Sequence, residues 1–383
     1  MKKIAFVIPW FGENIPGGAE SLCKETAIRL KDKGLTVEIL TTCIKDFRSD
    51  WNVNYWKEGT FQELGLVVRR FKVEKKDHML FNHLNEKLIN KIIPLPIEQQ
   101  AFMENMFKCP SLIQYIAHNH NEYHYFFLPY MFPSTYYGVL AAAGQSHLIP
   151  CLHNESYAYL PFYQHMFASA RKILFLSSSE AELAQKLYNL NPQKIIITGA
   201  GVDTTFTCEK KDSPPYILYV GRKDPSKNTP LLLEYFIKYK KSTNNKLQLI
   251  LIGPGDITFP HNSSITDHGF TTSEEKYNYM ANALFLCQPS TNESFSLAIM
   301  ESWLCERPVL VHGNCNATTE HCKNSNGGLW FDSYLSFESC CNYFLNQKIN
   351  GSIMGKQGKN YVLQNYTWEK VISKYMEVIA DAN

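Results

Sequence analysis

Short runs of consecutive apolar residues recur along the chain, and segments with apolar residues at helical spacing separate them. A strand that is buried on both faces reads as a continuous apolar run, so this alternation predicts parallel sheets covered by helices on both sides. The predicted strands of the first half are residues 4–9, 37–41, 67–71, 124–128, 147–152, 173–177 and 195–199. Those of the second half are residues 216–220, 247–252, 265–270, 284–288, 308–312 and 328–331.

A polar, proline-containing segment at residues 205–215 interrupts this alternation. The chain is therefore predicted to form two doubly wound, Rossmann-like α/β domains, residues 1–205 and 206–365, that face a central cleft. Open parallel sheets bind ligands beyond the carboxyl ends of their strands, so this cleft is the expected site. A last helical segment, residues 366–383, could pack back on the first domain. Residues 75–121 contain no clear strand and are interpreted as an irregular helical insertion.

Composition narrows the classes of protein to which the chain can belong. Its 383 residues and 45% hydrophobic content suffice for two cores, and a net charge of +2 gives no general attraction to nucleic acid. No apolar stretch approaches the roughly 20 residues of a membrane span, and the apolar start is too short for a signal peptide. Eleven scattered cysteines favour reduced thiols, so a cytoplasmic protein is expected.

Two glutamates, Glu293 and Glu301, form the most informative pair of side chains. The first follows a predicted strand and loop, and the second lies about two turns into a helix predicted from Phe295 to Leu304, with Ser294 as its cap. The helical rise sets the two carboxylates on the order of 10 Å apart. Each can accept hydrogen bonds from two neighbouring hydroxyls, such as those of a sugar or a ribose.

The start of the same helix offers a place for a phosphate. The amides expected there without intrahelical partners are those of Ser294, Phe295, Ser296 and Leu297. Together with the two carboxylates they suit a nucleotide that is joined to a sugar through a diphosphate. The alternative is an ordinary solvated helix face.

Two cations follow the strand predicted at residues 216–220. Arg222 comes directly after Gly221, and Lys227 lies five residues further along the same strand-to-helix loop. A diphosphate leaving group needs cations that stabilise its growing charge, and these two side chains could provide them. The alternative is a solvated turn.

Three residues of the first half are further candidates. Gly17 and Gly18 follow the first predicted strand and open a helix, where paired glycines let the backbone approach a ligand closely. His153 ends the predicted strand at residues 147–152, at the edge of the expected cleft. It could contact ligand or take part in catalysis, although a lone histidine is often structural.

These residues make the sequence similar to the retaining glycosyltransferases of the GT-B fold, family 4 (glycosyl transferases group 1), over nearly its whole length. The residues that carry the resemblance are Gly17 to Glu20, His153, Gly221, Arg222, Lys227, Asn228, Pro289, Ser290 and Glu293 to Glu301. The sequence departs from the family at Ser294 and Ser296, where many relatives have glycine.

The resemblance implies a role for each candidate. Gly17 and Gly18 would lie under the diphosphate and donor sugar, His153 would contact the sugar, Arg222 and Lys227 would neutralise the diphosphate, Glu293 would hold sugar hydroxyls, and Glu301 would hold the ribose. It also implies a UDP- or GDP-sugar donor, a glycan or lipid-linked acceptor hydroxyl, retention of anomeric configuration, and no metal or other cofactor. Surface polysaccharide or glycoconjugate biosynthesis is the expected setting.

Other functions on a similar fold would need different residues. A sugar-nucleotide epimerase or hydrolase on the same fold would need a base or water at the reacting carbon, and a non-catalytic binding subunit would not need the full set of charged residues. A nicotinamide dehydrogenase would need the full glycine fingerprint, which is missing.

Peripheral contact with the inner face of a membrane is a further hypothesis, based on the basic run at residues 69–76 and the apolar segment at residues 102–108.

Overall fold

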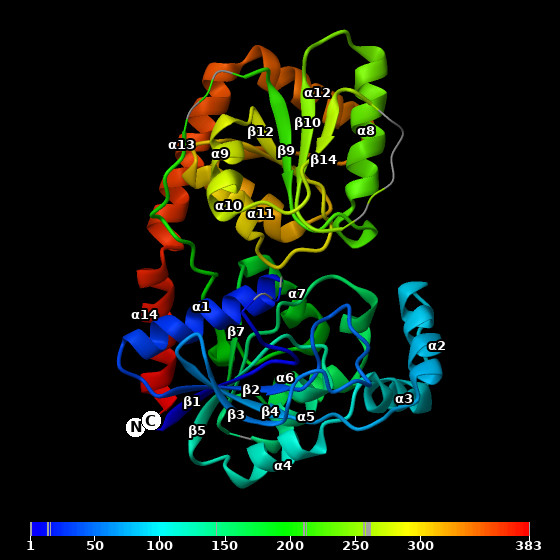
Figure 1. The fold of residues 1–383 in the computed structure, drawn as a ribbon, viewed down its shortest axis with the longest axis vertical. Coiled ribbons are helices and arrows are strands. Elements are labelled where there is room, and N and C mark those ends of the chain that lie inside the picture. The colour runs from blue at the N-terminus through cyan, green and yellow to red at the C-terminus, as the bar shows by residue number, and fades with distance from the viewer. Residues whose placement is uncertain are drawn as a thin grey trace. The chain divides into compact units, whose positions relative to one another are not determined.

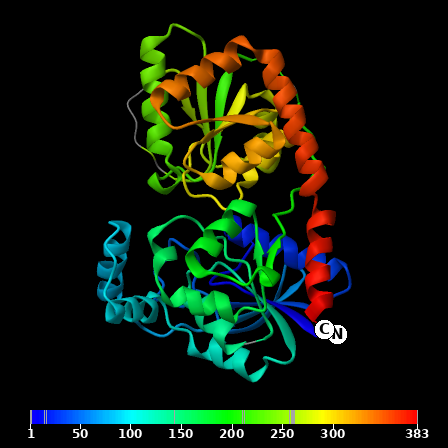
Figure 2. The same cartoon turned by 180° about the vertical axis from the view of Figure 1, so that it is seen from behind.

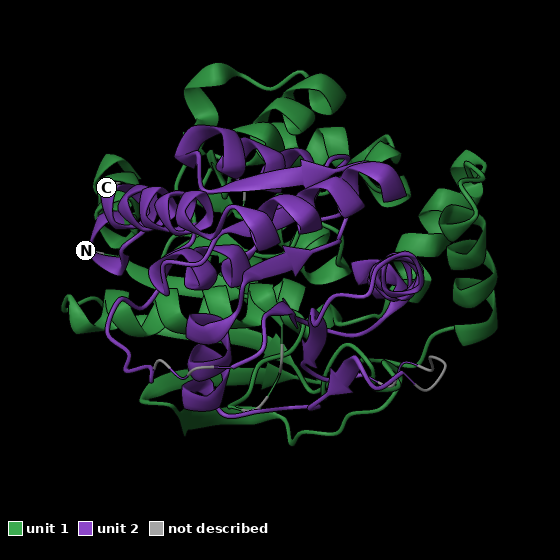
Figure 3. Ribbon diagram, turned by 90° about the horizontal axis from the view of Figure 1, so that it is seen from above, with its two compact units in different colours: residues 1–199, 371–383 green, residues 200–370 purple. Residues whose placement is uncertain are grey.

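The computed structural model describes residues 2–13, 15, 17–142, 144–209, 211, 213–255, 257 and 262–382. The chain forms two compact units, which Figure 3 distinguishes by colour. Unit 1 consists of Met1–Gly199 with Val371–Asn383, and unit 2 of Ala200–Lys370. Each unit has a largely parallel sheet with helices packed on it, as the apolar runs predict. Lys210 and Asp212, which belong to the predicted interruption, lie outside the described residues.

Unit 1 contains an eight-stranded sheet. In spatial order its strands are β3 (Gly59–Glu63), β4 (Leu66–Phe71), β2 (Val37–Thr42), β1 (Lys3–Val7), β5 (Tyr123–Phe127), β6 (Ser146–Leu148), β7 (Lys172–Phe175) and β8 (Ile195–Ile197). Every neighbouring pair is parallel except β3 and β4. The apolar runs therefore identify seven of these strands, and β3 is the one they miss.

Strand β3 escapes the pattern because it lies at the edge of the sheet and its side chains alternate between half-buried and exposed. It returns antiparallel to β4 through a turn at Leu64 and Gly65, whose φ angles are 54° and 73°. Positive φ at both central residues is what a two-residue type I′ hairpin requires, and leucine is an unusual residue for that conformation. The turn is therefore hard to recognise from sequence.

Helices cover both faces of the unit 1 sheet. They are α1 (Gly18–Asp32), α2 (His78–Ile89), α3 (Pro96–Met106), α4 (Pro110–His118), α5 (Pro133–Ala141), α6 (Phe162–Ser169) and α7 (Ser178–Tyr188), with the final helix α14 (Trp368–Ala382). Phe126 of β5 packs on Tyr375 of α14, with ring centroids 5.7 Å apart. Figure 2 shows the red helix α14 beside this sheet. Its Lys374 also donates to the carbonyls of Ile197 and Thr198.

The region predicted as a helical insertion does consist of helices, α2, α3 and α4. Figures 1 and 2 show α2 at the margin of unit 1. Several residues that suggested membrane contact are buried, whereas Lys72 and Lys75 of the basic run are exposed. Phe102 is fully buried, and Arg70 is 3% exposed with its guanidinium bonded to Glu63 and to the carbonyl of Phe11. They stabilise the fold of unit 1 instead.

Unit 2 contains a six-stranded, wholly parallel sheet. In spatial order its strands are β11 (Ile265–Asp267), β10 (Gln248–Ile252), β9 (Tyr216–Val220), β12 (Phe285–Gln288), β13 (Val309–His312) and β14 (Gly328–Phe331). The chain runs from β9 to one side of the sheet and from β12 to the other. The carboxyl ends of β9 and β12 therefore flank a topological switch point, where open α/β sheets bind ligands.

The helices of unit 2 are α8 (Thr229–Ser242), α9 (Ser273–Asn282), α10 (Leu297–Leu304), α11 (Asn316–Ser325), α12 (Tyr334–Asn346) and α13 (Lys348–Asn365). Figure 1 shows α8 on one side of the sheet and α9 and α10 on the other. Leu232 and Phe236 of α8 share a core with Phe337 and Phe344 of α12. Within the described ranges, no helix is both long and apolar enough to cross a membrane.

Candidate functional site

An ion pair joins the loops that follow β9 and β12. Lys227 lies in a short 3₁₀ turn (Pro225–Lys227), and its Nζ is 2.6 Å from Oε1 of Glu293. The two side chains are 23% and 11% exposed, so the pair is mostly but not fully shielded from water. Sixty-six residues separate the partners in sequence. The fold thus brings together the cation and the first carboxylate that the sequence proposed separately.

Arg222 lies on the same loop as Lys227, and its side chain is paired with an aspartate of that loop. Its Nε is 3.6 Å from Oδ2 of Asp224, and its side chain is 35% exposed. Asp224 also accepts hydrogen bonds from Ser226 Oγ at 2.5 Å and from the amide of Lys227. Burial acts to raise the pKa of Asp224, but these hydrogen bonds and the charge of Arg222 outweigh it, so the pKa lies below its usual value. The carboxylate therefore stays ionised and orders the loop.

The amide of Asn228 connects this loop directly to the loop after β12. Asn228 has a left-handed φ of 57°, and its Nδ2 donates to the carbonyl of Pro289 at 3.0 Å. Helix α8 begins at the next residue. This contact fixes the spacing between the Lys227 loop and the Glu293 loop.

A second ion pair joins the loop after β9 to the end of β11. The sequence analysis did not predict it. Lys223 is only 4% exposed, and its Nζ lies 2.5 and 2.6 Å from the two carboxylate oxygens of Asp267. Close backbone packing accompanies it, because a Cβ on Gly253 would lie 2.0 Å from the carbonyl oxygen of Gly221. Nothing in the sequence distinguished Lys223 from the neighbouring Arg222, and only the structure shows that Lys223 is buried.

Glu301 is paired with a residue that the sequence did not suggest. Its Oε1 lies 2.6 Å from Nζ of Lys276 and accepts a longer hydrogen bond, 3.4 Å, from the hydroxyl of Tyr277. Burial, followed by the nearby Glu301 charge, raises the pKa of the Tyr277 hydroxyl, which therefore stays protonated and able to donate. Glu293 and Glu301 thus each face a lysine on a different loop or helix.

Helix α10 begins later than predicted. It starts at Leu297, with Ser296 rather than Ser294 at the N-cap position, and no side chain caps it. Ser294 and Phe295 precede the helix, and Phe295 is buried against the rings of His321 and Tyr366 at centroid distances of 5.0 and 4.9 Å. The amides of Ser294 and Phe295 are therefore not helix-terminal, and only those from Ser296 and Leu297 onwards keep that property.

Ser296 adopts a backbone conformation that favours glycine. Its φ of 76° and ψ of 88° lie outside the regions that most L-residues occupy. Its hydroxyl accepts a hydrogen bond from Nε2 of Gln288 at 3.3 Å. A glycine at this position would relieve the backbone, while serine adds this one contact.

In unit 1, Gly17 caps helix α1, which begins at Gly18. A Cβ on Gly17 would lie 1.8 Å from Oε2 of Glu20, whereas a Cβ on Gly18 would meet nothing within 4 Å. The other oxygen of Glu20 accepts a hydrogen bond from Nε1 of Trp10 at 2.6 Å. Glu20 is thus held across the helix start, and a side chain at position 17 would displace its carboxylate. Pro16 lies outside the described residues.

His153 follows β6, but that strand ends at Leu148, earlier than predicted. The imidazole is 28% exposed, and its Nδ1 is 3.7 Å from Oε1 of Glu155. The same carboxylate oxygen accepts a hydrogen bond from the hydroxyl of Tyr130 at 2.9 Å. His153, Gly17 and Gly18 belong to unit 1, whereas the remaining predicted site residues belong to unit 2.

A buried carboxyl holds the segment that carries His153. Glu180 is 3% exposed, and its two oxygens accept hydrogen bonds from the amides of Leu152 and Leu176, both at 2.6 Å. Burial raises the pKa of Glu180 to about 7, although the amides of Leu176 and Leu152 and the charge of His153 lower it. In the sequence, its place just after the strand predicted at residues 173–177 is the one signal that points to Glu180.

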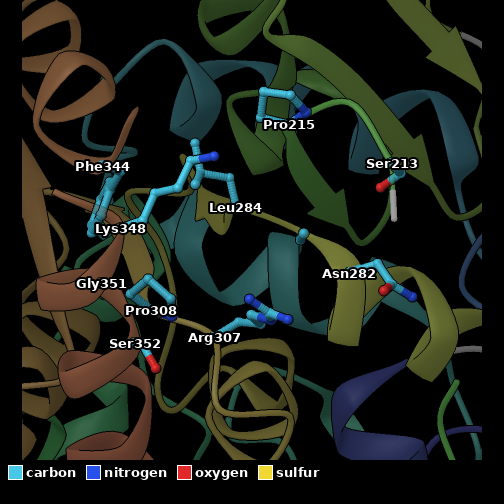
Figure 4. A pocket seen from close by; sticks show the side chains of 11 residues that line it. Ser213, Pro215, Asn282, Leu284, Arg307, Pro308, Phe344, Lys348, Gly351 and Ser352 are labelled. Atoms are coloured by element: carbon cyan, nitrogen blue, oxygen red, sulfur yellow. The ribbon is translucent and has the colours of Figure 1, made fainter. Parts of the chain in front are cut away.

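A cavity of about 180 Å³ lies elsewhere in unit 2 (Figure 4). Its lining includes Pro215, Leu284 and Pro308, each of which directly precedes a strand of the sheet. It therefore lies at the amino ends of the strands, whereas Arg222 and Glu293 follow the carboxyl ends. None of the predicted site residues lines it.

In the ranges that the structure describes, no three side chains of histidine, cysteine, aspartate or glutamate form a group that could hold a metal ion. His321 packs against the rings of Phe295 and Tyr366, and burial lowers its pKa to about 4. This ring is therefore a neutral part of the core.

Comparison with known proteins connects the geometry to a family. Residues 204–361, which include the three lysine ion pairs and the Arg222 loop, match the family described as "Glycosyl transferases group 1". These residues belong to the glycosyl transferases group 1 family. The match covers nearly all of unit 2.

Relatives of the chain extend the comparison. A probable sucrose-phosphate synthase from Thermosipho melanesiensis is 25% identical over 207 residues, which are 50% of this chain and 48% of the relative. The chain therefore matches about half the length of that curated relative. Sucrose-phosphate synthase from Thermosynechococcus elongatus superimposes with a TM-score of 0.73 at 14% identity, over 100% of this chain and 99% of that one.

HepE from Anabaena, solved in complex with UDP-glucose, superimposes with a TM-score of 0.67 at 14% identity, and all of both chains is covered. At such low identities the likeness to solved structures concerns the fold. That fold is GT-B, with two parallel-sheet domains, as the apolar runs and the motif residues predicted.

Proposed function

We propose that the chain is a retaining glycosyltransferase that moves a sugar from a nucleoside diphosphate sugar, with UDP or GDP as the nucleotide, to a hydroxyl of a glycan or lipid-linked acceptor. The observation that carries the proposal is the ion pair of Lys227 and Glu293 at the carboxyl ends of adjacent strands. It joins a cation suited to a diphosphate with a carboxylate suited to sugar hydroxyls. The group 1 match over residues 204–361 supports the same donor class.

The roles of the charged residues follow from the bond that breaks. The bond between the anomeric carbon and the diphosphate oxygen is cleaved, and negative charge grows on the diphosphate. Arg222 and Lys227 stabilise that charge, so the reaction needs no metal for this purpose. The acceptor hydroxyl approaches the face from which the diphosphate leaves, and a phosphate oxygen takes its proton. Glu293 accepts hydrogen bonds from the sugar, and Glu301 from the ribose.

Residues of unit 1 complete the proposed reaction. His153 is supported as a contact of the donor sugar by its exposure and its link to Glu155. Gly17 and Gly18 give the backbone close access to the diphosphate at the start of α1. Acceptor hydroxyls belong, on this proposal, to surface polysaccharides or other glycoconjugates. HepE, which has the same fold, was solved with UDP-glucose, and this supports UDP as the first nucleotide to test.

The test is product analysis with and without an acceptor. The chain is incubated with a nucleotide sugar alone and then with added glycan or lipid-linked acceptors, and the anomeric proton coupling of the product is read by NMR. We expect a new glycosidic bond with the donor's anomeric configuration, formed only when an acceptor is present. Conversion of the donor alone to an epimer or to free sugar would favour an epimerase or hydrolase, and an inverted product would contradict retention.

A further inference from the structure

The segment that joins α2 to α3 exposes an unusual concentration of aliphatic side chains. We call its five members the aliphatic tip: Ile89, Ile92, Ile93, Leu95 and Ile97, which are 63%, 54%, 75%, 64% and 71% exposed. Single exposed apolar residues are ordinary on a protein surface, but five within nine positions are not. A surface of this kind indicates a partner that covers it.

The aliphatic tip is a formed structure rather than a loose loop. Beneath it, Leu84 and Leu88 of α2 are buried, and Phe81 stacks on Phe102 of α3 with ring centroids 5.4 Å apart. An ion pair of 2.5 Å between Lys87 and Glu98 links the two helices at the base of the tip. The exposed side chains are therefore presented by a rigid support, and a partner binds them without first ordering the segment.

The backbone of the tip already satisfies most of its hydrogen-bond donors. The amides of Asn90, Lys91 and Ile92 donate to carbonyls of α2 at 2.8 to 3.0 Å, and the amide of Leu95 donates to Oε2 of Glu98 at 2.8 Å. Pro94 and Pro96 have no amide hydrogen to satisfy. An amide without a hydrogen-bond acceptor is costly in hydrocarbon. A segment in which most amides already have an acceptor is therefore suited to contact with lipid.

The side-chain chemistry of the tip also distinguishes between possible partners. Protein interfaces concentrate their binding energy in tryptophan, tyrosine and arginine, and residues 88–97 contain none of these. The only charged residue in that stretch is Lys91, which is exposed and suits anionic headgroups. We propose that the aliphatic tip inserts shallowly into the surface of a lipid bilayer and docks unit 1 on the membrane.

This membrane contact differs from the one that residues 69–76 and 102–108 suggested, since Arg70 and Phe102 are buried. It is also independent of the proposed donor site, whose charged residues all lie in unit 2. A failure of either proposal therefore leaves the other standing.

The experiment is co-sedimentation of the whole chain with vesicles of phosphatidylethanolamine and phosphatidylglycerol. We expect the native chain to pellet with the vesicles. The double variant Ile92→Asp with Ile93→Asp should remain in the supernatant, with binding reduced at least about tenfold, because aspartate in the aliphatic region of a bilayer is strongly disfavoured. Binding of the native chain should persist at high salt, because aliphatic insertion is not screened.

The matched control is Ile349→Asp, an isoleucine that is 78% exposed on α13 of unit 2. It should pellet like the native chain, and unchanged melting temperatures would show that all variants fold. The proposal is overturned if the native chain stays in the supernatant or if the double variant pellets equally well. It is also overturned if light scattering shows a dimer that the double variant abolishes while vesicle binding is absent, because a second copy would then be the partner.

Discussion

At the scale of single residues, the contact between Lys227 and Glu293 couples the two parts of the proposed donor. The pair is 2.6 Å long and only partly exposed, so its attraction is less screened than that of a surface pair. A diphosphate that approaches Lys227 competes with Glu293 for the ammonium group. Glu293 then gains freedom to accept hydrogen bonds from the sugar. Recognition of the diphosphate and recognition of the sugar are thereby linked through the ammonium group of Lys227.

This coupling predicts opposite effects for the variant Glu293→Gln. Lys227 loses its charged partner, so we expect UDP without a sugar to bind roughly fivefold more tightly, equivalent to about 1 kcal/mol. Transfer of the sugar should fall, because the amide is a weaker acceptor for its hydroxyls. Calorimetric titration with UDP and a transfer assay measure the two effects, with the exposed Glu234→Gln on α8 as the control. Parallel losses of UDP affinity and transfer would contradict the coupling.

A second residue-scale prediction concerns Glu180 and pH. Burial raises its pKa in the folded chain to about 7, above the value of about 4.3 expected when unfolded. The folded chain therefore retains this proton more strongly, and the stabilisation that results is complete below the unfolded pKa and is lost as pH rises through about 7. Glu180→Gln removes the titration. Urea unfolding at pH 5 and pH 8 should show a larger loss of stability in the native chain than in the variant, by up to about 3 kcal/mol.

Glu180→Gln also loses one acceptor of a buried amide, which lowers stability at every pH. Only the difference between the two pH values therefore tests the prediction. Equal pH dependence in the two chains would contradict it. Unfolding of Glu234→Gln at the same pH values controls for loss of an exposed carboxyl.

At the scale of elements, continuous burial is what made strands predictable. Strand β9 occupies the predicted residues 216–220 because its side chains are buried or nearly so along its whole length. Strand β3 was missed because only alternate residues are half-buried. The start of α10 was placed too early because Phe295 fits a helical pattern, yet its ring is needed in a core formed with His321 and Tyr366. Such long-range contacts are invisible in local spacing.

The candidate site shows the same limit. Its charged residues stood out because they follow strands or open helices, and this is local information. Their pairing is not local: Lys223 reaches Asp267, Lys227 reaches Glu293, and Lys276 reaches Glu301 across different loops. Lysine, aspartate and glutamate are so common in loops that these ion pairs could not be predicted from the sequence alone.

Packing between α10 and α13 gives a prediction at this scale. A Cβ on Gly358 of α13 would lie 2.2 Å from Cδ1 of Trp303, which is fully buried on α10. Although alanine normally favours a helix over glycine, Gly358→Ala should destabilise unit 2 by about 1–3 kcal/mol through overpacking. Denaturant unfolding measures this change in the free energy of unfolding.

The same helix provides the control, because a Cβ on Gly351 would make only ordinary contacts, at 3.6 Å from Phe344 and Pro308. Gly351→Ala should therefore be neutral or stabilising. If Gly358→Ala were no less stable than Gly351→Ala, the close packing of α13 on Trp303 would be refuted.

For the whole molecule, the two units divide the proposed work. The group 1 match and the charged residues Arg222, Lys227, Glu293 and Glu301 are in unit 2. Unit 1 contributes Gly17, Gly18 and His153, and it also has the aliphatic tip. Helix α14 belongs to both units: its Trp368 packs on Gly201 within unit 2, and its Tyr375 packs on Phe126 within unit 1. An enzyme that uses a membrane-borne acceptor would need both capacities.

The central claim is that the loops after β9 and β12 bind a nucleoside diphosphate sugar, and thermal shift with a panel of nucleotide sugars tests it most directly. A ligand at about 100 times its Kd stabilises the folded chain by about 2.7 kcal/mol, which is a clear rise in melting temperature. We expect such a rise for at least one UDP- or GDP-sugar, its loss in Arg222→Ala with Lys227→Ala, and its retention in the exposed control Lys241→Ala. No shift with any nucleotide sugar, or an equal shift in the double variant, would contradict the account.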